Sequence, residues 1–321
     1  MNKPEDLLLI TIIIPIYNRG KMLQKTLESI LCQIYRPIEL ILVDNGSQDN
    51  SLEICLKFQE TFSCLFLNIK VLQEKKKGAN AARNAGLAEA TGDYVLFFDS
   101  DDELFEDCIA NMVGELIIDK FPKAVAVTSY LQLPNGTRTI RPKHISKNPA
   151  DHLFDTVIPT HSICIKRSVL NEIGPWDEDL ERWQDLEFGF RTLLQTDDLV
   201  WFKDKPLYVV YQHEESISGK SYFEDHEKMD ASLMKIKATI EKQKKGFKRR
   251  RQQRALCYKI GSIGAQLRKE GHPELGKKYL KKALSQLPFA RIILAHCLLR
   301  FQYLYEGKGG RGLWRISRII L

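Results

Sequence analysis

Three carboxylates stand within four residues directly after an apolar run. In the sequence YVLFFDSDDEL (residues 94–104) they are Asp99, Asp101 and Asp102. Like charges this close repel one another, so the cluster destabilises the fold unless a cation lies against it. Oxygen ligands of this kind suit Mg²⁺ or Mn²⁺, which bind carboxylates, phosphate oxygens and water. The cluster therefore predicts a divalent metal site; the alternative is that Ser100 or Asp101 caps a helix beginning near Glu103.

Other polar residues follow two further apolar runs. Residues 7–18 read LLLITIIIPIYN and residues 38–44 read IELILVD, and such short β-branched runs predict buried strands. The first run ends in Pro15, Tyr17 and Asn18, and the second ends in Asp44. An aromatic ring at such a strand end can line a nucleobase pocket. A carboxylate there can bind a nucleobase or ribose, or it can simply begin an Asx turn.

Helices are expected between these strands. Apolar residues recur at helical spacing in residues 21–33 and 52–62, and residues 78–92 form an Ala-rich helix closed by Gly. Strands at 65–72 and 94–98 complete the alternation. This order predicts an α/β fold with a mostly parallel sheet, helices on both faces and ligands at the carboxyl ends of the strands. Arg83, in the Ala-rich helix, is either a surface residue or a ligand for a diphosphate.

The middle of the chain reads as shorter elements. Runs at 124–133 and 137–141 flank Pro134-Asn135-Gly136 and predict a hairpin. A strand is expected at 161–165, with a helix starting near Arg167. Residues 174–195 predict a loop that leads into an amphipathic helix, and residues 199–211 contain strand-like runs.

The composition changes near residue 225. Beyond it the chain is rich in Lys and Arg and helical in pattern, with turns at Gly271-His272-Pro273 and at Pro288. We therefore predict an α/β domain at 1–225 and a basic α-helical C-terminal extension at 226–321, with the boundary between 225 and 250. Residues 271–289 resemble a single helix-turn-helix unit of tetratricopeptide type, which cannot bury its own apolar face alone.

Bulk composition limits the classes of protein that remain. The 321 residues are 44% hydrophobic and 28% charged with a net charge of +7, as in ordinary globular proteins. The seven cysteines are odd in number and show no CxxC spacing, which argues against a disulfide framework or zinc site and favours a reducing compartment. We find no signal peptide and no apolar stretch long enough to span a bilayer, so we expect a cytoplasmic protein.

Two basic regions could contact an anionic membrane. One is the block KQKKGFKRRRQQR at 242–254, and the other is the C-terminus, where 291–305 and 313–321 mix apolar residues with Arg. The alternatives are a solvated linker for the first and a buried amphipathic helix for the second. We therefore leave open a peripheral contact with the inner membrane face through the basic C-terminal helices, and we expect no nucleic-acid partner.

Together these blocks resemble the family 2 glycosyltransferases of GT-A fold. The resemblance rests on ITIIIPIYNR, ELILVDNGSQDNS and KGANAARNAGLAEATGDYVLFFDSDDEL, in this order and spacing. It covers about the first hundred residues, is extended by GPWDEDL…WQDLEFGFR and ends near residue 220. The resemblance implies a nucleotide-diphospho-sugar donor, more often UDP- than GDP-linked, and Mn²⁺ or Mg²⁺ as cofactor.

The resemblance also assigns roles to individual residues. It places Asp44 on the uracil or guanine, Asp99 near the ribose and Asp101 on the metal, with Asp102 as an alternative metal ligand. The remaining nucleotide-sugar residues are expected to be Pro15, Tyr17, Asn18, Arg83 and Ser100. His213, in YQHEESIS, resembles a late family element that meets the metal or diphosphate, although a lone His is often a structural hydrogen-bonding residue.

The acceptor hydroxyl must lose a proton to a base during transfer. In the family this base is an Asp at the start of a helix, and Trp183-Gln184-Asp185 matches with Asp185 in that position. Gln184 replaces the usual Glu. Alternatively, Asp185 is a helix N-terminal charge favoured by the dipole. His161 and Trp176 are expected to shape the acceptor side.

The sequence thus predicts an inverting, metal-dependent enzyme that adds one sugar to a lipid-linked, saccharide or protein hydroxyl in polysaccharide or glycolipid synthesis. Processive relatives carry Gln-x-x-Arg-Trp, but here Asp179 stands in the Gln position before Arg182-Trp183. A sugar-phosphate nucleotidyltransferase is disfavoured because Gly-rich sequence is missing after the first strand. The remaining alternative is a non-catalytic sugar-nucleotide-binding scaffold that acts through its helical tail.

Overall fold

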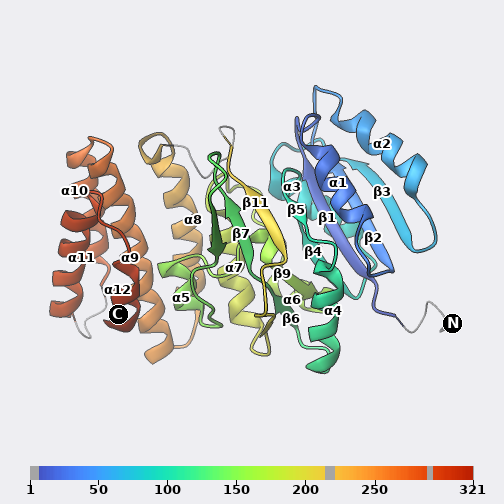
Figure 1. Cartoon of the computed structure of the whole chain (residues 1–321). Helices are drawn as coiled ribbons and strands as arrows, with labels where there is room; N and C mark the ends of the chain where they lie inside the picture. Colours follow the sequence, from blue (N-terminus) through green and yellow to red (C-terminus); the bar gives the residue numbers. More distant parts are fainter. Residues whose placement is uncertain (1–6, 214–220, 288–291, 321) are drawn as a thin grey trace. The chain divides into compact units, whose positions relative to one another are not determined.

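The computed structural model describes residues 7–213, 221–287 and 292–320 (Figure 1). These residues form two compact units. Unit 1 contains the described residues up to Ile145, with Ile158–Asp179 and Gln195–His213, and unit 2 contains Ser146–Val157, Leu180–Leu194 and the described residues after 213. The division of the chain into domains at 1–225 and 226–321 stays a prediction; two segments from before residue 225 group with the helical unit.

Unit 1 is built on a seven-stranded sheet of order β10-β6-β9-β4-β1-β2-β3. Its strands are β1 (Ile10–Ile16), β2 (Ile38–Asp44), β3 (Leu67–Gln73), β4 (Tyr94–Phe97), β6 (Ala124–Ala126), β9 (Ile163–Lys166) and β10 (Val200–Trp201). Neighbours pair in parallel except at β9, which is antiparallel to both β4 and β6. The predicted α/β fold with a mostly parallel sheet is confirmed.

Pro15 lies in a central strand, where a missing N–H normally breaks the ladder. The pairing of β1 with β4 runs only from Ile10 to Ile13, so Pro15 lies beyond its end and pairs with Val43 of β2 alone. The strand therefore tolerates Pro where it approaches the carboxyl-end rim of the sheet.

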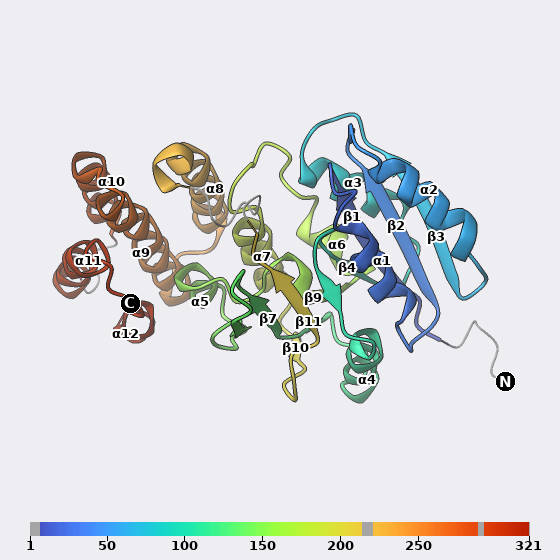
Figure 2. The ribbon, with the colours of Figure 1, turned by 45° about the horizontal axis from the view of Figure 1, so that its top comes forward.

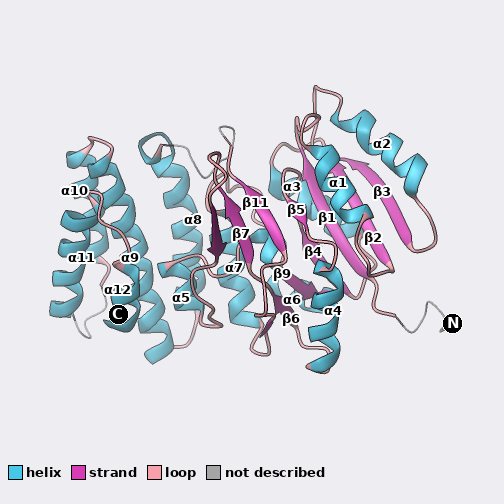
Figure 3. Ribbon diagram, viewed as in Figure 1, coloured by secondary structure: helices cyan, strands magenta, loops and turns pink. Residues whose placement is uncertain are grey.

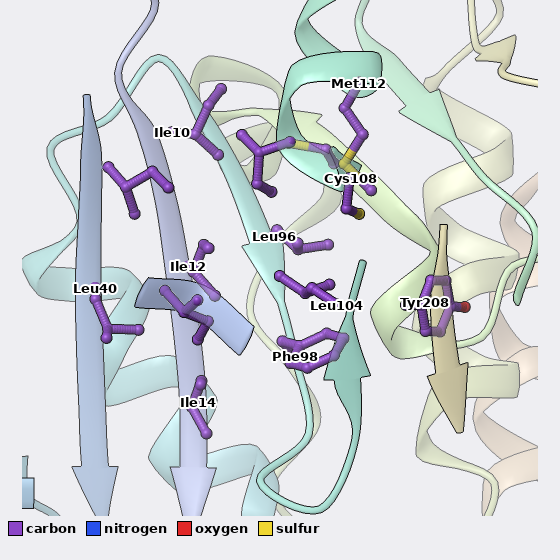
Figure 4. Close-up of a cluster of buried hydrophobic side chains, with 14 of the residues drawn as sticks. Ile10, Ile12, Ile14, Leu40, Leu96, Phe98, Leu104, Cys108, Met112 and Tyr208 are labelled. Atoms are coloured by element: carbon purple, nitrogen blue, oxygen red, sulfur yellow. The ribbon is translucent and has the colours of Figure 1, made fainter. Parts of the chain in front are cut away.

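Helices cover both faces of this sheet. Helices α1 (Leu23–Leu31), α2 (Ser51–Phe62) and α4 (Cys108–Ile118) pack on one face against alternate side chains of the strands, including Ile10, Ile12, Ile14, Leu40 and Leu96 (Figure 4). Helix α3 (Ala79–Glu89) packs on the other face, where Gly86 lies against Ile13 and Val43. Helix α6 (Arg167–Ile173) follows β9 directly, as predicted.

A smaller sheet of order β5-β11-β7-β8 completes unit 1. Its strands are β5 (Glu103–Leu104), β7 (Ser129–Gln132), β8 (Arg138–Arg141) and β11 (Tyr208–Tyr211). The predicted hairpin is present as β7–β8, but the expected strand at 124–133 is divided, because β6 joins the large sheet and β7 the small one. Glu103 begins a strand rather than a helix, so the helix-cap alternative for Ser100 or Asp101 is wrong.

The described residues of unit 2 form helices joined by loops, with no strand among them (Figures 2 and 3). Its helices are α5 (Pro149–Phe154), α7 (Gln184–Gln195, whose last residue groups with unit 1), α8 (Tyr222–Lys242), α9 (Phe247–Lys269), α10 (Pro273–Ser285), α11 (Ile292–Glu306) and α12 (Trp314–Ile320). They bury a core that includes Phe190, Leu233, Tyr258 and Leu299. The turn predicted at Gly271-His272-Pro273 joins α9 to α10, and Pro288 falls outside the described residues.

Helices α9 and α10 approach closely through two glycines. A Cβ on Gly276 would lie 2.5 Å from the carbonyl oxygen of Gly264, and one on Gly264 would lie 2.7 Å from that of Gly276. The described part of residues 271–289 contains one helix, α10, rather than the two helices expected of a helix-turn-helix unit. Helix α10 packs against both α9 and α11, which bury its apolar face.

The basic block at 242–254 is partly used inside unit 2. Arg254 is buried, Arg251 Nη2 lies 2.8 Å from Asp151 Oδ1, and Arg249 donates to the carbonyl of Gln243. The block spans the turn between α8 and α9 and the first turns of α9. It is thus in part a structural feature of the helical unit.

Candidate active site

The acidic cluster lies at the carboxyl end of β4, in the short turn before β5. The buried side chain of Phe98 precedes it, and Asp102 and Ser100 are buried, whereas the side chains of Asp101 and Asp99 are 19% and 31% exposed. The turn therefore leaves Asp99 and Asp101 partly exposed and buries Asp102.

Two cationic or imidazole side chains approach Asp101. His213 Nε2 lies 2.9 Å from Asp101 Oδ2, and Arg19 Nε lies 3.5 Å from the same oxygen. Arg19 follows β1 and His213 follows β11, so the two sheets of unit 1 bring together residues almost two hundred positions apart. Of the predicted metal ligands, the structure brings His213 into direct contact with Asp101.

A second histidine, His161, lies between the other two carboxylates. Its Nδ1 atom is 3.2 Å from Asp99 Oδ2 and 3.5 Å from Asp102 Oδ2. One ligand atom from each of these three residues lies within 4.8 Å of the others, which is close enough for them to hold one metal ion. Tyr211 N–H also donates to Asp102, at 3.1 Å.

The environments of Asp99 and Asp102 push their pKa values in opposite directions. Burial tends to raise the pKa of Asp99, but the hydrogen bond from His161 and the Arg83 guanidinium together hold it well below its usual range. Burial raises the pKa of Asp102, and the charges of Asp99 and Asp101 raise it further, while His161 only partly opposes them. Asp102 therefore holds a proton more readily than Asp99 does, and a cation nearby would oppose this by favouring the ionised form.

Arg83 is buried rather than on the surface. Its Nη2 lies 3.0 Å from Asp99 Oδ1, its Nη1 donates to Asn80 Oδ1, and its guanidinium lies 4.7 Å from the ring centroid of Trp176. Trp176 is buried and packs edge-on against Phe97. Helix α3 thus supplies the arginine that balances Asp99, and its role toward a diphosphate stays a prediction.

The loops after β1 and β2 are joined by hydrogen bonds at the same rim. Asp44 is buried and accepts from the N–H groups of Gly46 and Ser47, as the Asx-turn alternative predicts. Asn18, in the left-handed conformation at φ 51°, donates through its N–H to Ser47 Oγ and accepts from Gln48 N–H. Tyr17 is exposed beside them. The roles of Pro15, Tyr17, Asn18, Asp44 and Ser100 toward a nucleotide sugar stay predictions.

Asp185 belongs to unit 2. It is the second residue of α7, where its carboxylate accepts from the N–H of Leu186 at 2.9 Å, and Gln184 donates from its side chain to the carbonyl of Leu180. Trp183, just before the helix, has a left-handed φ of 53°. The predicted helix start is confirmed, and the role of Asp185 as a base stays a prediction.

Sequence reasoning missed Arg19 and placed His161 and Trp176 on the acceptor side. The structure puts all three in contact with the acidic cluster or with Arg83. The Asn18-Arg19-Gly20 turn after β1 was a usable signal for Arg19, because residues at strand carboxyl ends share one rim. His161 had no such signal, since it lies in the 3-10 turn Thr160–Ser162 just before β9, and that turn reaches the rim only because β9 runs antiparallel to its neighbours.

Among the described residues, no helix combines the length and apolar character that crossing a bilayer requires.

Comparison with known proteins identifies the family of this sequence. The model of glycosyl transferase family 2 matches residues 11–174, which is just over half of the chain.

Several curated proteins share part of this sequence. Glycosyltransferase GlyG of Streptococcus pneumoniae serotype 4 is 46% identical over 109 residues, 34% of this chain and 35% of its own length. Glycosyltransferase GlyA of the same organism is 37% identical over 121 residues, 38% of this chain and 16% of its own length. An uncharacterized glycosyltransferase of Bacillus subtilis, YwdF, is 33% identical over 187 residues, which cover 57% of this chain and 67% of that protein. The match thus spans well under half of the two streptococcal proteins.

Solved structures share the fold over nearly the whole chain. S. aureus TarS 1–349 in complex with UDP-GlcNAc has a TM-score of 0.67 at 18% identity, covering 97% of this chain and 91% of that one. Mannosyltransferase PcManGT from Pyrobaculum calidifontis, in complex with GDP-Man and Mn²⁺, has a TM-score of 0.62 at 17% identity, covering 99% and 85%. At this identity the likeness shows the fold, which is that of GT-A glycosyltransferases.

Proposed function

Because the chain belongs to glycosyl transferase family 2, we propose that it is an inverting, metal-dependent and non-processive glycosyltransferase. It moves a sugar from a nucleotide-diphospho-sugar to a hydroxyl of a lipid-linked, saccharide or protein acceptor, in polysaccharide or glycolipid synthesis. The observation that carries the proposal is the acidic turn after β4, whose carboxylates meet two histidines and two arginines from distant segments.

The residues of this turn suit a divalent cation. Carboxylate oxygens and an imidazole nitrogen are common ligands for Mn²⁺, and adjacent ligands of an octahedral ion of this size lie about 3 Å apart. The Asp101–His213 contact of 2.9 Å and the Asp99–His161 contact of 3.2 Å both have this spacing. We propose that Asp101 and His213 hold the metal, with Asp102 as the alternative ligand; the group of Asp99, Asp102 and His161 is the competing site. When bound, the ion would act as a Lewis acid that stabilises charge on the leaving diphosphate.

The protein's own residues supply the remaining functions. Asp44 and Tyr17 hold the nucleobase, Asp99 holds the ribose, and Asp185 takes the proton of the acceptor hydroxyl. Attack by that hydroxyl on the anomeric carbon breaks the bond to the diphosphate and inverts the configuration. Arg83, whose guanidinium pairs with Asp99, is the residue we propose to contact the diphosphate oxygens.

The donor is proposed to be UDP-linked rather than GDP-linked. TarS, which shares the fold over 97% of this chain, is described with UDP-GlcNAc and with UDP, whereas PcManGT is described with GDP-Man. Addition of a single sugar is supported by Asp179, which stands where processive relatives carry Gln in the Gln-x-x-Arg-Trp motif.

Calorimetry with UDP and GDP, with and without Mn²⁺, tests the donor site. We expect Mn²⁺-dependent binding of UDP to the wild type and its loss in Asp101→Ala. The matched control is Asp119→Ala, which removes an exposed carboxylate at the end of α4 and should bind as the wild type does. Failure of both nucleotides to bind at any metal concentration would overturn the proposal.

A non-catalytic sugar-nucleotide-binding scaffold remains the second candidate. The scaffold is favoured by Gln184, which stands where the family usually has Glu. Its side-chain amide donates a hydrogen bond to the carbonyl of Leu180. Nucleotide binding without any sugar transfer or donor hydrolysis that depends on Asp185 would support the scaffold instead of the enzyme.

We place the reaction in the cytoplasm at the inner membrane face, and the surface we propose for contact is the outer face of α11. Leu294, Phe301, Leu304 and Tyr305 are exposed along it. Residues 292–320 carry five cationic side chains and one acid, Glu306, which is turned toward Tyr258 and Gln302 of its own unit. Apolar residues with a cationic surround suit an anionic bilayer surface.

Vesicle sedimentation tests this contact. We expect binding to vesicles of phosphatidylglycerol with phosphatidylcholine, and little binding to phosphatidylcholine alone. The double variant Phe301→Ser with Leu304→Ser should lose binding, whereas Ile117→Ser with Ile118→Ser, which removes two exposed apolar side chains of α4, should retain it. Equal binding by both double variants would contradict the assignment.

A further inference from the structure

The segment before Asp185 has a backbone conformation that needs outside support. Trp183 has φ 53°, a region that side chains other than Gly, Asn or Asp seldom adopt. It lies directly before α7, whose first two residues are Gln184 and Asp185. Any shift of Trp183 therefore moves the helix start and the carboxylate two residues further on.

Helix α8 holds the backbone and side chain of Arg182 from two positions. Ser232, fully buried, donates its hydroxyl to the carbonyl of Arg182, and Asp225, also buried, pairs with the Arg182 guanidinium at 3.3 Å. Both Ser232 and Asp225 lie in the range 225–250, where we predicted the boundary between the α/β domain and the helical extension. The residue before Trp183 is thus tied at its carbonyl and at its charged end.

Trp183 itself is held between α8 and α9. Tyr222, at the start of α8, meets the indole edge-on with ring centroids 6.2 Å apart. The ammonium of Lys259, on α9, lies 4.9 Å from the centroid of the same ring. A cation at this distance over an indole is attracted by its π-electrons, more strongly when both are removed from water.

Lys259 also faces acidic groups. Burial lowers the pKa of its ammonium, and the carboxylates of Asp155, Asp185 and Glu306 oppose this. These groups come from the end of α5, from α7 and from α11 respectively. Tyr258 and Gln302 donate to Glu306, so that carboxylate is already fixed elsewhere. Lys259 therefore acts on the helix start through its contact with the indole of Trp183.

We propose that the C-terminal helices α8 and α9 position the candidate base, with Ser232 and Asp225 holding Arg182 and Lys259 holding Trp183. Lys259 is on this view a positioning residue contributed by the helical extension. The inference rests on the proposed function in so far as Asp185 is the base, but the positioning of residues 182–186 can be measured without any reaction.

Three substitutions test this arrangement in the full chain. They are Lys259→Met, Lys259→Arg and Ser232→Ala, with Lys248→Met as the control, because Lys248 is an exposed lysine in the first turn of α9. We expect hydrogen exchange of the amides at 182–186 to accelerate in Lys259→Met and Ser232→Ala and to stay at the wild-type rate in Lys248→Met. Lys259→Arg, which keeps the cation over the indole, should restore much of the protection.

Kinetic measurements test whether the positioning of residues 182–186 affects the reaction. In Lys259→Met we expect kcat to fall about tenfold to a hundredfold, while the dissociation constant for the donor nucleotide stays within about twofold. Loss of folded protein alone would lower kcat and the number of nucleotide-binding sites together, whereas Lys259→Arg should recover much of the wild-type kcat.

Unchanged exchange at 182–186 in both Lys259→Met and Ser232→Ala would overturn the inference, whatever the activity. A wild type without transfer activity would overturn the proposed enzyme instead, and faster exchange in these two variants would still support the positioning. Faster exchange with wild-type kcat would refute the link between the helices and the base.

Discussion

In unit 1, the acidic turn after β4 is surrounded by side chains from loops and helices that are far apart in the sequence, whereas in unit 2 the surroundings of Asp185 come mainly from two long helices. The first arrangement balances charge against charge at the edge of a buried sheet. The second holds a helix start through one hydroxyl, one ion pair, one aromatic ring and one ammonium group. Substitutions in unit 1 should therefore act mainly on binding, and those around α7 mainly on turnover.

Asp185→Asn is the sharpest test of this difference, with the largest expected effect. Loss of a general base should lower kcat about 10³-fold, while calorimetric binding of the nucleotide stays close to wild type. Asp179→Asn, which neutralises an exposed carboxylate shortly before, should leave both unchanged. A large loss of nucleotide binding in Asp185→Asn would show that the two roles are not divided in this way.

The two histidines of unit 1 form a matched pair. His213→Ala should weaken Mn²⁺-dependent nucleotide binding about a hundredfold, because it removes a proposed ligand beside Asp101, while His161→Ala should weaken it about tenfold by freeing Asp99 and Asp102. Manganese titration of both variants measures this order. A larger loss in His161→Ala would move the metal to the Asp99, Asp102 and His161 group.

Glycine substitutions compare how tightly the two units are packed. A Cβ on Gly276 meets backbone of Gly264 at 2.5 Å, so Gly276→Ala must separate α9 from α10 and should destabilise by about 3 kcal/mol. A Cβ on Gly86 meets the Ile13 side chain at 2.5 Å, and Gly86→Ala should cost about 1–2 kcal/mol. Urea unfolding measures both.

Gly114 is the control for these substitutions. It lies inside α4 with nothing within 4 Å of a Cβ, so Gly114→Ala should stabilise by about 1 kcal/mol through helix propensity. If Gly276→Ala unfolded with wild-type stability, the close approach of α9 and α10 would be refuted.

A pH-dependent effect is expected at Glu39, at the opposite end of the large sheet. Burial tends to raise the pKa of Glu39, but hydrogen bonds from Thr11 and Thr91 and the ion pair with Lys70 lower it overall. A carboxyl whose pKa is lower in the folded than in the unfolded state stabilises the fold above the unfolded pKa, and this contribution disappears as pH falls through the folded value. Glu39→Gln should therefore cost about 1.5 kcal/mol at pH 7, and less in acid. A cost that did not shrink on acidification would contradict the electrostatic explanation.

Much of unit 1 was predictable because its elements are defined by local patterns. The strand at 38–44 has the predicted bounds, and the other early strands and helices differ by a few residues at their ends. Alternation of buried runs with helical spacing is a local property, so it survives folding. The division of 124–133 between two sheets was not predictable, because both halves have strand composition and only pairing partners distinguish them.

The family, the α/β fold and the position of the acidic residues after a buried strand could be read from the amino-acid sequence, since each depends on residue types at short spacing. Which cations balance those carboxylates depends on how distant segments pack. Arg19, Arg83, His161 and His213 come from four separate segments, and their meeting depends on strand order. The same holds for the packing of Asp185 with the C-terminal helices. Contacts between distant segments follow from packing of whole elements, which no short stretch of sequence specifies.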